Sequence, residues 1–332
     1  MECVTLAHGS GGSETGKLIN DLFLSYFNND ILCTQNDASL LGSIPGILAI
    51  TTDSYVVSPL FFPGGDIGKL SMCGTINDLS VSGATPLYIT VGFIIEEGFN
   101  MCPLEKIVYS MAKTAKLSHV KIVAGDTKVV ERGKCDKLFI NTTGVGIIEN
   151  SPLSHKLKEG DQIILSGSLG DHGACIMSKR NLFNFDSTLT SDCAPLNEVT
   201  QLILHASSKV RVMRDPTRGG LATTLNELVL KSDKSMLIYE ESLPIKEEVQ
   251  SFCDLLGLDP LYVANEGKLV CIVAKEDSDK VLNAMHQHPL SKEAVIIGEV
   301  VFNNHNKVYL KTLLGATRIL PVSTGELLPR IC

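Results

Sequence analysis

Apolar and polar positions recur along this chain with two different periods, which predicts a protein of mixed strands and helices. Residues 46–57 (GILAITTDSYVV) form an apolar run between two prolines, and this run predicts a buried strand. Residues 66–82 carry apolar side chains every three to four positions, as a helix does. In the rest of the first half we expect strands at 86–95, 120–124 and 139–148, and a helix at 103–117.

The second half continues the mixture after a polar, proline-interrupted stretch at 150–160. Strands are expected at 161–166, 236–239, 269–273 and 294–300, and helices at 174–179, 219–230, 245–256 and 278–287. We therefore predict an α/β (or α+β) protein with mixed sheets and two domains, 1–150 and 151–322. A mobile, extended tail is expected at 323–332, because Pro329 keeps the residue before it out of helical geometry.

Composition narrows the class of protein. The 332 residues are 44% hydrophobic and 20% charged, which is typical of a globular protein. The formal net charge is −8 and no basic block occurs, so we expect no nucleic-acid partner. No apolar run approaches the roughly 20 residues of a membrane helix, and the first residues lack the pattern of a signal peptide. We expect a cytoplasmic protein. Ten cysteines occur without a Cys-x-x-Cys pair, which argues against a cysteine metal site.

Four aspartates share an unusual context of small or hydroxyl neighbours. They are Asp53 after two threonines, Asp78 in 74–78 (GTIND), Asp126 in 125–128 (GDTK) after the strand 120–124, and Asp215 in 215–220 (DPTRGG). Small neighbours let a polyphosphate approach the backbone, and Mg²⁺ prefers carboxylate and phosphate oxygens. Each aspartate alone is adequately explained as a cap or turn residue. Together they favour a metal–nucleotide site in one cleft.

Other polar residues are candidates for the same site. Gly11 and Gly12 belong to a loop, 8–13 (HGSGGS), that could fold over phosphates, although it lacks the spacing and lysine of a Walker loop and a plain linker is an equal alternative. Lys69 could contact phosphate or remain a solvated helix charge. Asn77 directly precedes Asp78 and is included among the nucleotide-binding candidates.

Two residues are candidates for proton transfer. Glu266 lies in a short loop, 265–267 (NEG), before an expected strand, where a carboxylate is well placed to accept a proton. A hairpin turn is the simpler explanation of the same loop. Lys128 follows Asp126 by two residues and carries the same ambiguity between a catalytic and a solvated side chain.

Cys332 stands out because it is the last residue. Its thiol can travel with the tail, and the thiolate of a free cysteine, with a pKa of about 8.5, is a nucleophile. The adjacent α-carboxylate disfavours the thiolate, and Arg330 partly offsets this. An incidental terminal cysteine is the alternative. We predict that Cys332 carries the reacting group.

These motifs, together with the terminus 329–332 (PRIC), resemble the HypE family of hydrogenase expression/formation proteins, within the superfamily of PurM-like ATP-binding enzymes. The resemblance covers essentially the whole chain; the internal motifs indicate the superfamily and the terminus indicates the family. It implies a PurM-like N-terminal domain that dimerises through its sheet and binds ATP near the dimer interface, and an α/β C-terminal domain.

The resemblance also implies a reaction. A carbamoyltransferase, HypF, would place a carbamoyl group on Cys332. The chain would then dehydrate this S-carboxamide to an S-cyanide with cleavage of ATP, and the cyanide would pass to iron on the HypC–HypD complex for a [NiFe]-hydrogenase. The implied Mg²⁺ ligands are Asp53, Asp78, Asp126 and Asp215. Two alternatives remain open: a small-molecule kinase or synthetase of the same superfamily, and a non-catalytic carrier that uses nucleotide to control partner docking.

Overall fold

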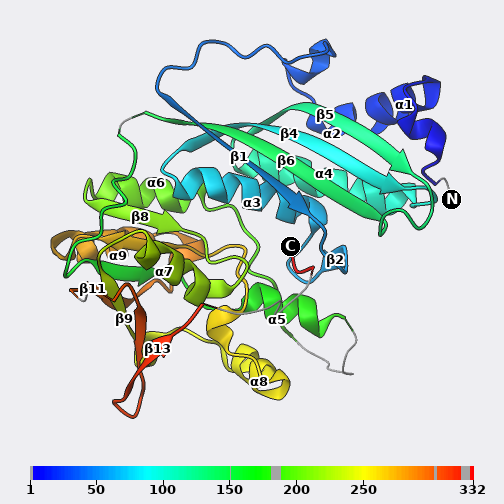
Figure 1. Cartoon of the computed structure of the whole chain (residues 1–332). Coiled ribbons are helices and arrows are strands. Elements are labelled where there is room, and N and C mark those ends of the chain that lie inside the picture. The colour runs from blue at the N-terminus through cyan, green and yellow to red at the C-terminus, as the bar shows by residue number, and fades with distance from the viewer. Residues whose placement is uncertain (1–2, 150, 181–187, 303–304, 323–329) are drawn as a thin grey trace.

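The computed structural model describes residues 3–149, 151–180, 188–302, 305–322 and 330–332. The chain builds two α/β units, each around its own sheet (Figure 1). The first sheet has four strands in the order β1-β6-β4-β5, and the second has seven in the order β13-β12-β9-β11-β7-β10-β8. Parallel and antiparallel neighbours occur in both sheets, so the expected α/β class with mixed sheets is confirmed.

The elements of the first unit follow the predicted order. Its strands are β1 (Ile47–Tyr55), β2 (Phe61–Phe62), β3 (Gly65–Asp66), β4 (Thr85–Glu96), β5 (Lys121–Val130) and β6 (Leu138–Ile148). Its helices are α1 (Ser13–Leu18), α2 (Leu24–Phe27), α3 (Ile67–Val81) and α4 (Met101–Leu117). The helix predicted at 66–82 is α3, and Asp66 caps it by accepting from the backbone N–H groups of Gly68 and Lys69.

The second unit contains elements that the sequence pattern missed. Its strands are β7 (Gln162–Leu165), β8 (Val210–Arg214), β9 (Ser235–Tyr239), β10 (Val270–Val273), β11 (Val295–Val301), β12 (Val308–Lys311) and β13 (Thr317–Leu320). Its helices are α5 (Asp171–Ser178), α6 (Asn197–Ala206), α7 (Gly220–Leu230), α8 (Glu247–Leu256) and α9 (Ser278–Met285). Helix α6 and strands β8, β12 and β13 were not predicted.

Helix α3 lies between the first sheet and the second unit (Figure 1). Almost all of its residues are buried, because it contacts β1 and β6 on one side and α6 and β8 on the other. A helix that is covered all round has no polar stripe, and this explains the weak amphipathic pattern of 67–81. The polar residues that α3 does carry, including Asn77 and Asp78, therefore lie at the junction of the two units.

Two expectations about the first sheet were wrong. Residues 46–57 were expected to form a buried strand, but β1 is an edge strand whose alternate residues Leu48, Ile50 and Thr52 are exposed. Asp126 was expected after a strand ending at residue 124, but β5 continues to Val130 and contains it. Strand β5 pairs with β4 from Lys121 to Val130, and the hydrogen bonds of this parallel pair hold the residues after 124 in the strand.

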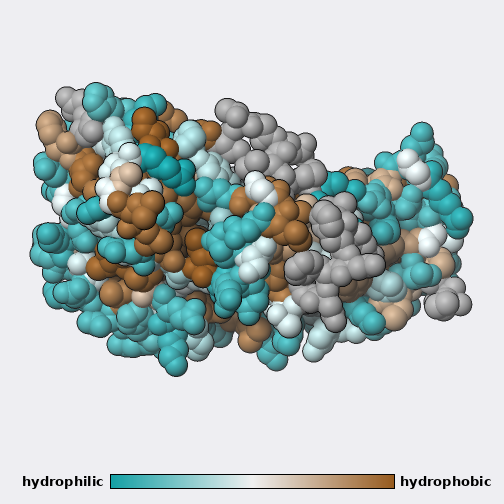
Figure 2. Space-filling view, turned by 90° about the horizontal axis from the view of Figure 1, so that it is seen from below, coloured by the Kyte–Doolittle hydropathy of each residue, from teal (hydrophilic) through white to brown (hydrophobic). Residues whose placement is uncertain are grey.

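No helix in the described part of the chain is long and apolar enough to cross a membrane. Figure 2 views the molecule from below, where the second unit faces the viewer and hydrophobic residues gather in the left half of the surface. The β12–β13 hairpin contributes exposed apolar side chains to the second unit, among them Leu313, Leu314 and Ile319.

Candidate functional site

Four carboxylates gather where the two units meet, and we call them the acidic group: Asp53, Asp78, Asp215 and Glu266. Asp53 comes from β1 and Asp78 from α3, where the Thr51 hydroxyl donates to Asp78 Oδ2 at 2.8 Å. Asp215 follows β8, and Glu266 lies in the loop before β10. The structure therefore brings three of the four predicted metal-binding aspartates together with the predicted base.

The acidic group carries more negative charge than its surroundings balance. Burial, and then the nearby Asp78, raise the pKa of Asp53 to about 6, although Arg218 acts in the opposite direction. Burial and Asp78 raise the pKa of Asp215 to about 7. Burial, followed by Cys193 and Asp215, raises the pKa of Glu266 well above its ordinary value. Burial is the first cause of each shift, and the neighbouring acidic groups add to it.

Close packing explains one of the glycines beside these aspartates. A Cβ on Gly74 would collide with the Tyr55 hydroxyl, so only glycine lets β1 lie this close to α3. Asp53 and Tyr55 lie on the same side of β1, because side chains alternate along a strand. Gly74 therefore permits the approach of β1 that brings Asp53 to Asp78. The small residues beside the aspartates were expected to admit phosphate, whereas Gly74 serves close packing against Tyr55.

The loop that carries Glu266 is held from several sides. The backbone N–H groups of Glu266 and Gly267 both donate to the Asp192 carboxylate, each at 3.1 Å. Asn265 accepts from the N–H of Gly170 at 2.7 Å. The Glu266 side chain is only 3% exposed. The simpler explanation of 265–267 as a surface hairpin turn does not fit this buried and anchored loop.

Asn77 occupies a different place from the predicted one. Its amide donates to the carbonyls of Ala194 and Glu266, at 3.1 and 3.3 Å, and its oxygen accepts from the N–H of Leu196 at 2.8 Å. The side chain is 1% exposed and joins α3 to the second unit. Because its amide is engaged with backbone groups, Asn77 positions the Glu266 loop, and nothing in this geometry offers it to a nucleotide.

The end of the chain docks beside the acidic group. The backbone oxygens of Arg330 and Cys332 accept from the N–H groups of Ser58 and Val56, at 3.2 and 3.3 Å. The Ile331 side chain is 3% exposed. Burial, and then Glu266, raise the pKa of the Cys332 thiol to about 12, against the effect of Arg218. The expected tail residues 323–329 lie outside the described part of the chain, and residues 330–332 are in a docked position.

The remaining candidates lie on the other face of the first sheet. Asp126 pairs across the sheet with Gly92 and, through it, with Asn141 and Ser54. Asp53 is one position away in this register, opposite Thr142, whose hydroxyl donates to the Ser71 carbonyl of α3. Asp53 and Asp126 therefore point to opposite faces of the sheet. The structure does not bring Asp126 to the acidic group within one copy of the chain.

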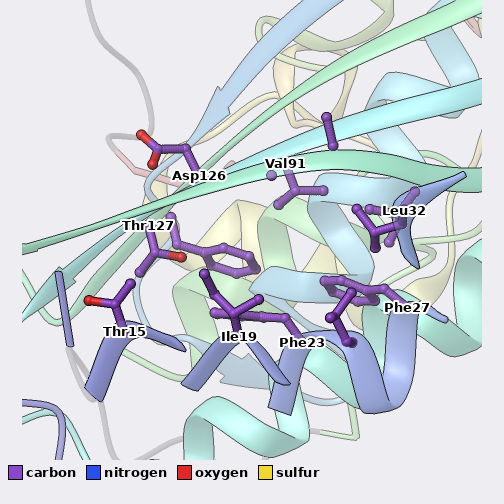
Figure 3. Close-up of a pocket in the computed structure, with 13 residues that line it drawn as sticks. Thr15, Ile19, Phe23, Phe27, Leu32, Val91, Asp126 and Thr127 are labelled. Atoms are coloured by element: carbon purple, nitrogen blue, oxygen red, sulfur yellow. The ribbon is translucent and has the colours of Figure 1, made fainter. Parts of the chain in front are cut away.

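Asp126 has its own surroundings, at the rim of an apolar pocket between β5 and the N-terminal helices (Figure 3). Phe23, Phe27 and Val91 line the pocket, and the Asp126 carboxylate points away from it. Lys128 Nζ lies 3.4 Å from Asp126 Oδ1, and both side chains are largely exposed. The glycine-rich loop is adjacent, since the Gly11 N–H donates at 2.9 Å to Thr15, which also lines the pocket.

Lys69 and Arg218 are two cationic side chains relevant to the site. Lys69 lies in the first turn of α3, where its Nζ donates to the Gly64 carbonyl at 2.8 Å, and its phosphate contact remains a prediction. Arg218 was not predicted, yet it is the cation that opposes the pKa shifts of Asp53 and Cys332. The signal available in the sequence was its place in the motif 215–220 beside Asp215.

The donor atoms of the acidic group fit Mg²⁺. All four residues offer carboxylate oxygen, the ligand type that Mg²⁺ prefers. Within the described residues, no three His, Cys, Asp or Glu side chains are arranged to hold a metal by themselves. This agrees with the usual Mg²⁺ site, in which one or two carboxylates act together with substrate phosphates and water.

Comparison with known proteins matches this architecture. Residues 36–148 match the family model of the AIR synthase related protein, N-terminal domain, and residues 158–311 match the corresponding C-terminal domain. The chain is 50% identical to the carbamoyl dehydratase HypE of Bradyrhizobium diazoefficiens, over 99% of this chain and 96% of the relative. It is 46% identical to the carbamoyl dehydratase HypE of Escherichia coli over the whole of both chains.

Solved structures give the same result. A crystal structure of the hydrogenase maturation protein HypE in complex with ATP superposes with a TM-score of 0.94 at 48% identity, and covers 99% of each chain. A crystal structure of a HypE–HypF complex superposes with a TM-score of 0.81 at 47% identity, over 92% of this chain and 99% of that one. The chain therefore belongs to the HypE family, and its two units carry the domains of the AIR synthase related proteins.

Proposed function

We propose that this chain is an ATP-dependent carbamoyl dehydratase that converts the S-carboxamide on its own Cys332 to an S-cyanide during hydrogenase maturation. The observation that carries the proposal is the docked terminus, which sets the Cys332 thiol beside Glu266, Asp53 and Arg218. A small-molecule kinase of the same superfamily has no use for a terminal cysteine in its site. A non-catalytic carrier has no use for a buried carboxylate next to that cysteine.

The reaction needs the parts that surround Cys332. A primary amide becomes a nitrile when its oxygen leaves and both N–H protons are removed. Oxygen is a poor leaving group, and transfer of the γ-phosphoryl group of ATP to the amide oxygen lets it leave as phosphate. Glu266 is the proposed acceptor of an N–H proton, because it is a buried carboxyl group beside Cys332. Burial raises its pKa, so Glu266 must first lose its own proton before it acts as the base. Attachment to the chain replaces substrate binding by an intramolecular step.

The docked thiol is in the wrong protonation state to gain its carbamoyl group. With a pKa near 12, Cys332 is a neutral thiol at neutral pH, and the thiolate is the nucleophile. We therefore infer two positions of the terminus: an outer one, where the carbamoyltransferase HypF modifies the thiol, and the docked one, where dehydration occurs. ATP favours the docked position only if the nucleotide-bound site contacts the terminus better.

Mg²⁺ and ATP would contact both the acidic group and the candidate residues near the pocket of Figure 3. Asp53, Asp78 and Asp215 are the proposed Mg²⁺ ligands, of which one or two at a time would act together with phosphate oxygens and water. The Mg²⁺ would offset the charge that develops on the transferred phosphoryl group. The pocket of Figure 3 is apolar and lies beside the loop of Gly11 and Gly12, so it suits the base of a nucleotide. Asp126, Lys128 and Lys69 are the remaining proposed phosphate or metal contacts, although Asp126 and Lys128 lie on the opposite sheet face.

A second copy of the chain offers a way to unite the two groups. The exposed face of the first sheet presents Leu48, Ile50 and Ile94, which are 62%, 74% and 43% exposed. Ile94 is in register with Lys128, so this apolar face also carries the side chains of Asp126 and Lys128. We propose a homodimer through this face, which covers the apolar row and places Asp126 and Lys128 at a shared site.

Ile50→Glu should convert the dimer to a monomer, because a buried charge without a partner is strongly unfavourable at an interface. Analytical ultracentrifugation would show a halved mass at micromolar concentration, and ATP cleavage should fall at least about tenfold if the site is shared. Leu314→Glu is the matched control, since Leu314 is 97% exposed on the β12–β13 hairpin. An Ile50→Glu chain that keeps the mass of the unaltered protein would show that the dimer forms elsewhere.

The proposed function is tested by following the mass of the intact chain. Incubation with HypF, carbamoyl phosphate and Mg-ATP should add about 43 Da to Cys332 and then remove about 18 Da, as expected for thiolate chemistry followed by dehydration. Cys332→Ser should show neither change, because an alcohol is a far weaker nucleophile at neutral pH. Carbamoylation and dehydration at another residue of the Cys332→Ser chain would refute the assignment.

The remaining parts of the proposal follow from this chemistry. The reaction belongs in the cytoplasm, where thiols stay reduced and Cys332 remains available. The cyanide would pass from Cys332 to iron on a HypC–HypD complex, and covalent attachment holds it until that transfer.

A further inference from the structure

His172 is a buried histidine that contacts the docked terminus. It lies at the start of α5, is fully buried, and packs edge-on against Phe62 with ring centroids 5.5 Å apart. Its Nδ1 lies 2.8 Å from the Ser191 hydroxyl, and its Nε2 lies 2.7 Å from the carbonyl oxygen of Ile331. The residue that it contacts directly precedes Cys332 in the chain.

The hydrogen bonds fix which ring nitrogen carries the proton. A carbonyl oxygen only accepts, so Nε2 must be the N–H that donates to Ile331. The Cys193 N–H donates to Ser191 Oγ at 3.1 Å, which leaves the Ser191 proton for Nδ1. Burial lowers the pKa of His172, which favours the neutral ring that this pattern requires. Cys193, Ser191 and His172 thus form one directed chain of donors that ends on the terminus.

The backbone of the terminus needs this donor. The backbone oxygens of Arg330 and Cys332 point toward residues 56–58 and accept from the N–H groups of Ser58 and Val56. The Ile331 carbonyl lies between them in sequence and points instead to His172, after a turn at Arg330, whose φ is +54°. In the described part of the structure, His172 is the hydrogen-bond partner of that carbonyl. Without it, a buried carbonyl next to Cys332 would have to find another donor.

We propose that His172, oriented by Ser191, is a positioning residue that holds the docked terminus so that the Cys332 carboxamide lies beside Glu266. His172 does not touch the reacting atoms; it acts through the Ile331 carbonyl. The inference rests on the proposed function, because it assigns to dehydration the docked position and to carbamoylation the outer one. Departure of the terminus breaks the bond between Nε2–H and the Ile331 carbonyl, so this bond contributes to the docked position alone.

The test compares His172→Phe with His172→Gln in the full-length chain. Phenylalanine keeps the aromatic shape and removes both hydrogen bonds, whereas the glutamine amide can still donate to Ile331. One readout is the rate at which iodoacetamide alkylates Cys332, resolved from the other cysteines by peptide mass spectrometry. The other is the rate of dehydration of the carbamoylated chain in a single turnover, followed by intact mass.

His172→Phe should alkylate about tenfold faster at Cys332 and dehydrate about tenfold more slowly, as expected for the loss of one buried hydrogen bond. His172→Gln should have alkylation and dehydration rates close to those of the unaltered chain. The matched control is His286→Phe, because His286 also bonds a backbone carbonyl, that of Ala294, at a distant place in the second unit. It should change neither rate.

Two results would overturn the proposal. One is a His172→Phe chain with the alkylation and dehydration rates of the unaltered chain. The other is an equal loss in His172→Phe and His172→Gln, which would assign the effect to shape and not to the donor. If the unaltered chain does not dehydrate a carboxamide at all, the proposed function fails. The alkylation rates then still decide whether His172 holds the terminus.

Discussion

Replacing Glu266 by glutamine should lower the rate of dehydration by a factor on the order of 10²–10⁴, the usual contribution of a positioned general base. Glutamine has the same size and cannot accept the N–H proton of the carboxamide. The loop itself should persist, because the backbone N–H groups of Glu266 and Gly267 are bound by Asp192 and not by the side chain that changes. Single-turnover mass spectrometry of the carbamoylated chain measures the effect.

A second readout separates the base from a purely structural role. Burial raises the pKa of Glu266 well above its ordinary value, so the unaltered chain loses stability as the pH rises above the ordinary pKa of a glutamate, near 4.5. The glutamine variant does not ionise and lacks this loss. Its stability relative to the unaltered chain should therefore grow from pH 5 to pH 8 in thermal unfolding without Mg²⁺. Glu241→Gln, at an exposed position of the second unit, is the control.

A Glu266→Gln chain that dehydrates its carboxamide at the normal rate would remove Glu266 from the mechanism. Lys128, the other predicted proton acceptor, would then become the stronger candidate, and it could reach the site only from a second copy of the chain. Mg-ATP binding to Glu266→Gln should be retained, which isothermal titration calorimetry can verify. Loss of both binding and turnover would instead assign Glu266 to the metal–nucleotide site.

The pattern of apolar positions predicted a helix or strand well where the residues of that element alone produce the pattern. The spacing of apolar positions at 66–82 led to α3, which spans Ile67–Val81, although burial on nearly all sides makes its amphipathic pattern weak. The same pattern could not reveal that β1 is an edge strand, because a run of apolar residues is equally compatible with burial in a sheet and with burial by a second copy. Helix α6 and strand β8 were missed although each has a local pattern. The buried Val199 and Ile203 lie four positions apart on α6, and Arg211 separates the buried Val210 and Val212 in β8.

The sequence predicted which residues belong to the site better than it predicted where they lie. Four aspartates in similar contexts suggested a single cleft, but strand register separates Asp126 from Asp53 by turning them to opposite faces of the sheet. Asn77 was grouped with Asp78 by adjacency, although neighbouring helix positions face different directions and its amide bonds the second unit. Nothing in residues 167–173 signals that His172 meets the other end of the chain, because that contact depends on the complete fold.

Replacing Asp53 by asparagine should weaken Mg-ATP binding by on the order of 10–100-fold, because it removes one carboxylate from a cation site that holds few protein ligands. Asp78→Asn should act in the same direction, and it also alters the acceptor of the Thr51 hydroxyl. ATP cleavage by the carbamoylated chain should fall with the binding. Asp37→Asn, in an exposed loop before β1, is the matched control and should bind Mg-ATP normally.

The pH dependence gives this prediction a sign. Because the pKa of Asp53 is about 6 and that of Asp215 about 7, each carboxylate holds a proton through part of the range in which an ordinary aspartate is ionised. Mg²⁺ competes with those protons, so Mg-ATP affinity should fall as the pH drops from 8 to 5.5. Calorimetry in two buffers of different ionisation enthalpy would detect the protons released on binding. Asp53→Asn should release fewer of them.

Without Mg²⁺, the raised pKa of Asp53 should lower the stability of the folded protein as the pH rises. A carboxylate whose folded pKa is raised costs stability above its unfolded pKa, near 3.8 for Asp53, and the full cost is present once the pH passes the folded value near 6. Asp53→Asn removes that cost, so the variant should be more stable than the unaltered chain at pH 8 by on the order of 1–3 kcal/mol, allowing for solvent screening at a half-buried site. At pH 4 the difference should vanish. A destabilised Asp53→Asn chain at pH 8 without Mg²⁺ would contradict the electrostatic account of the acidic group, even if Mg-ATP binding were lost.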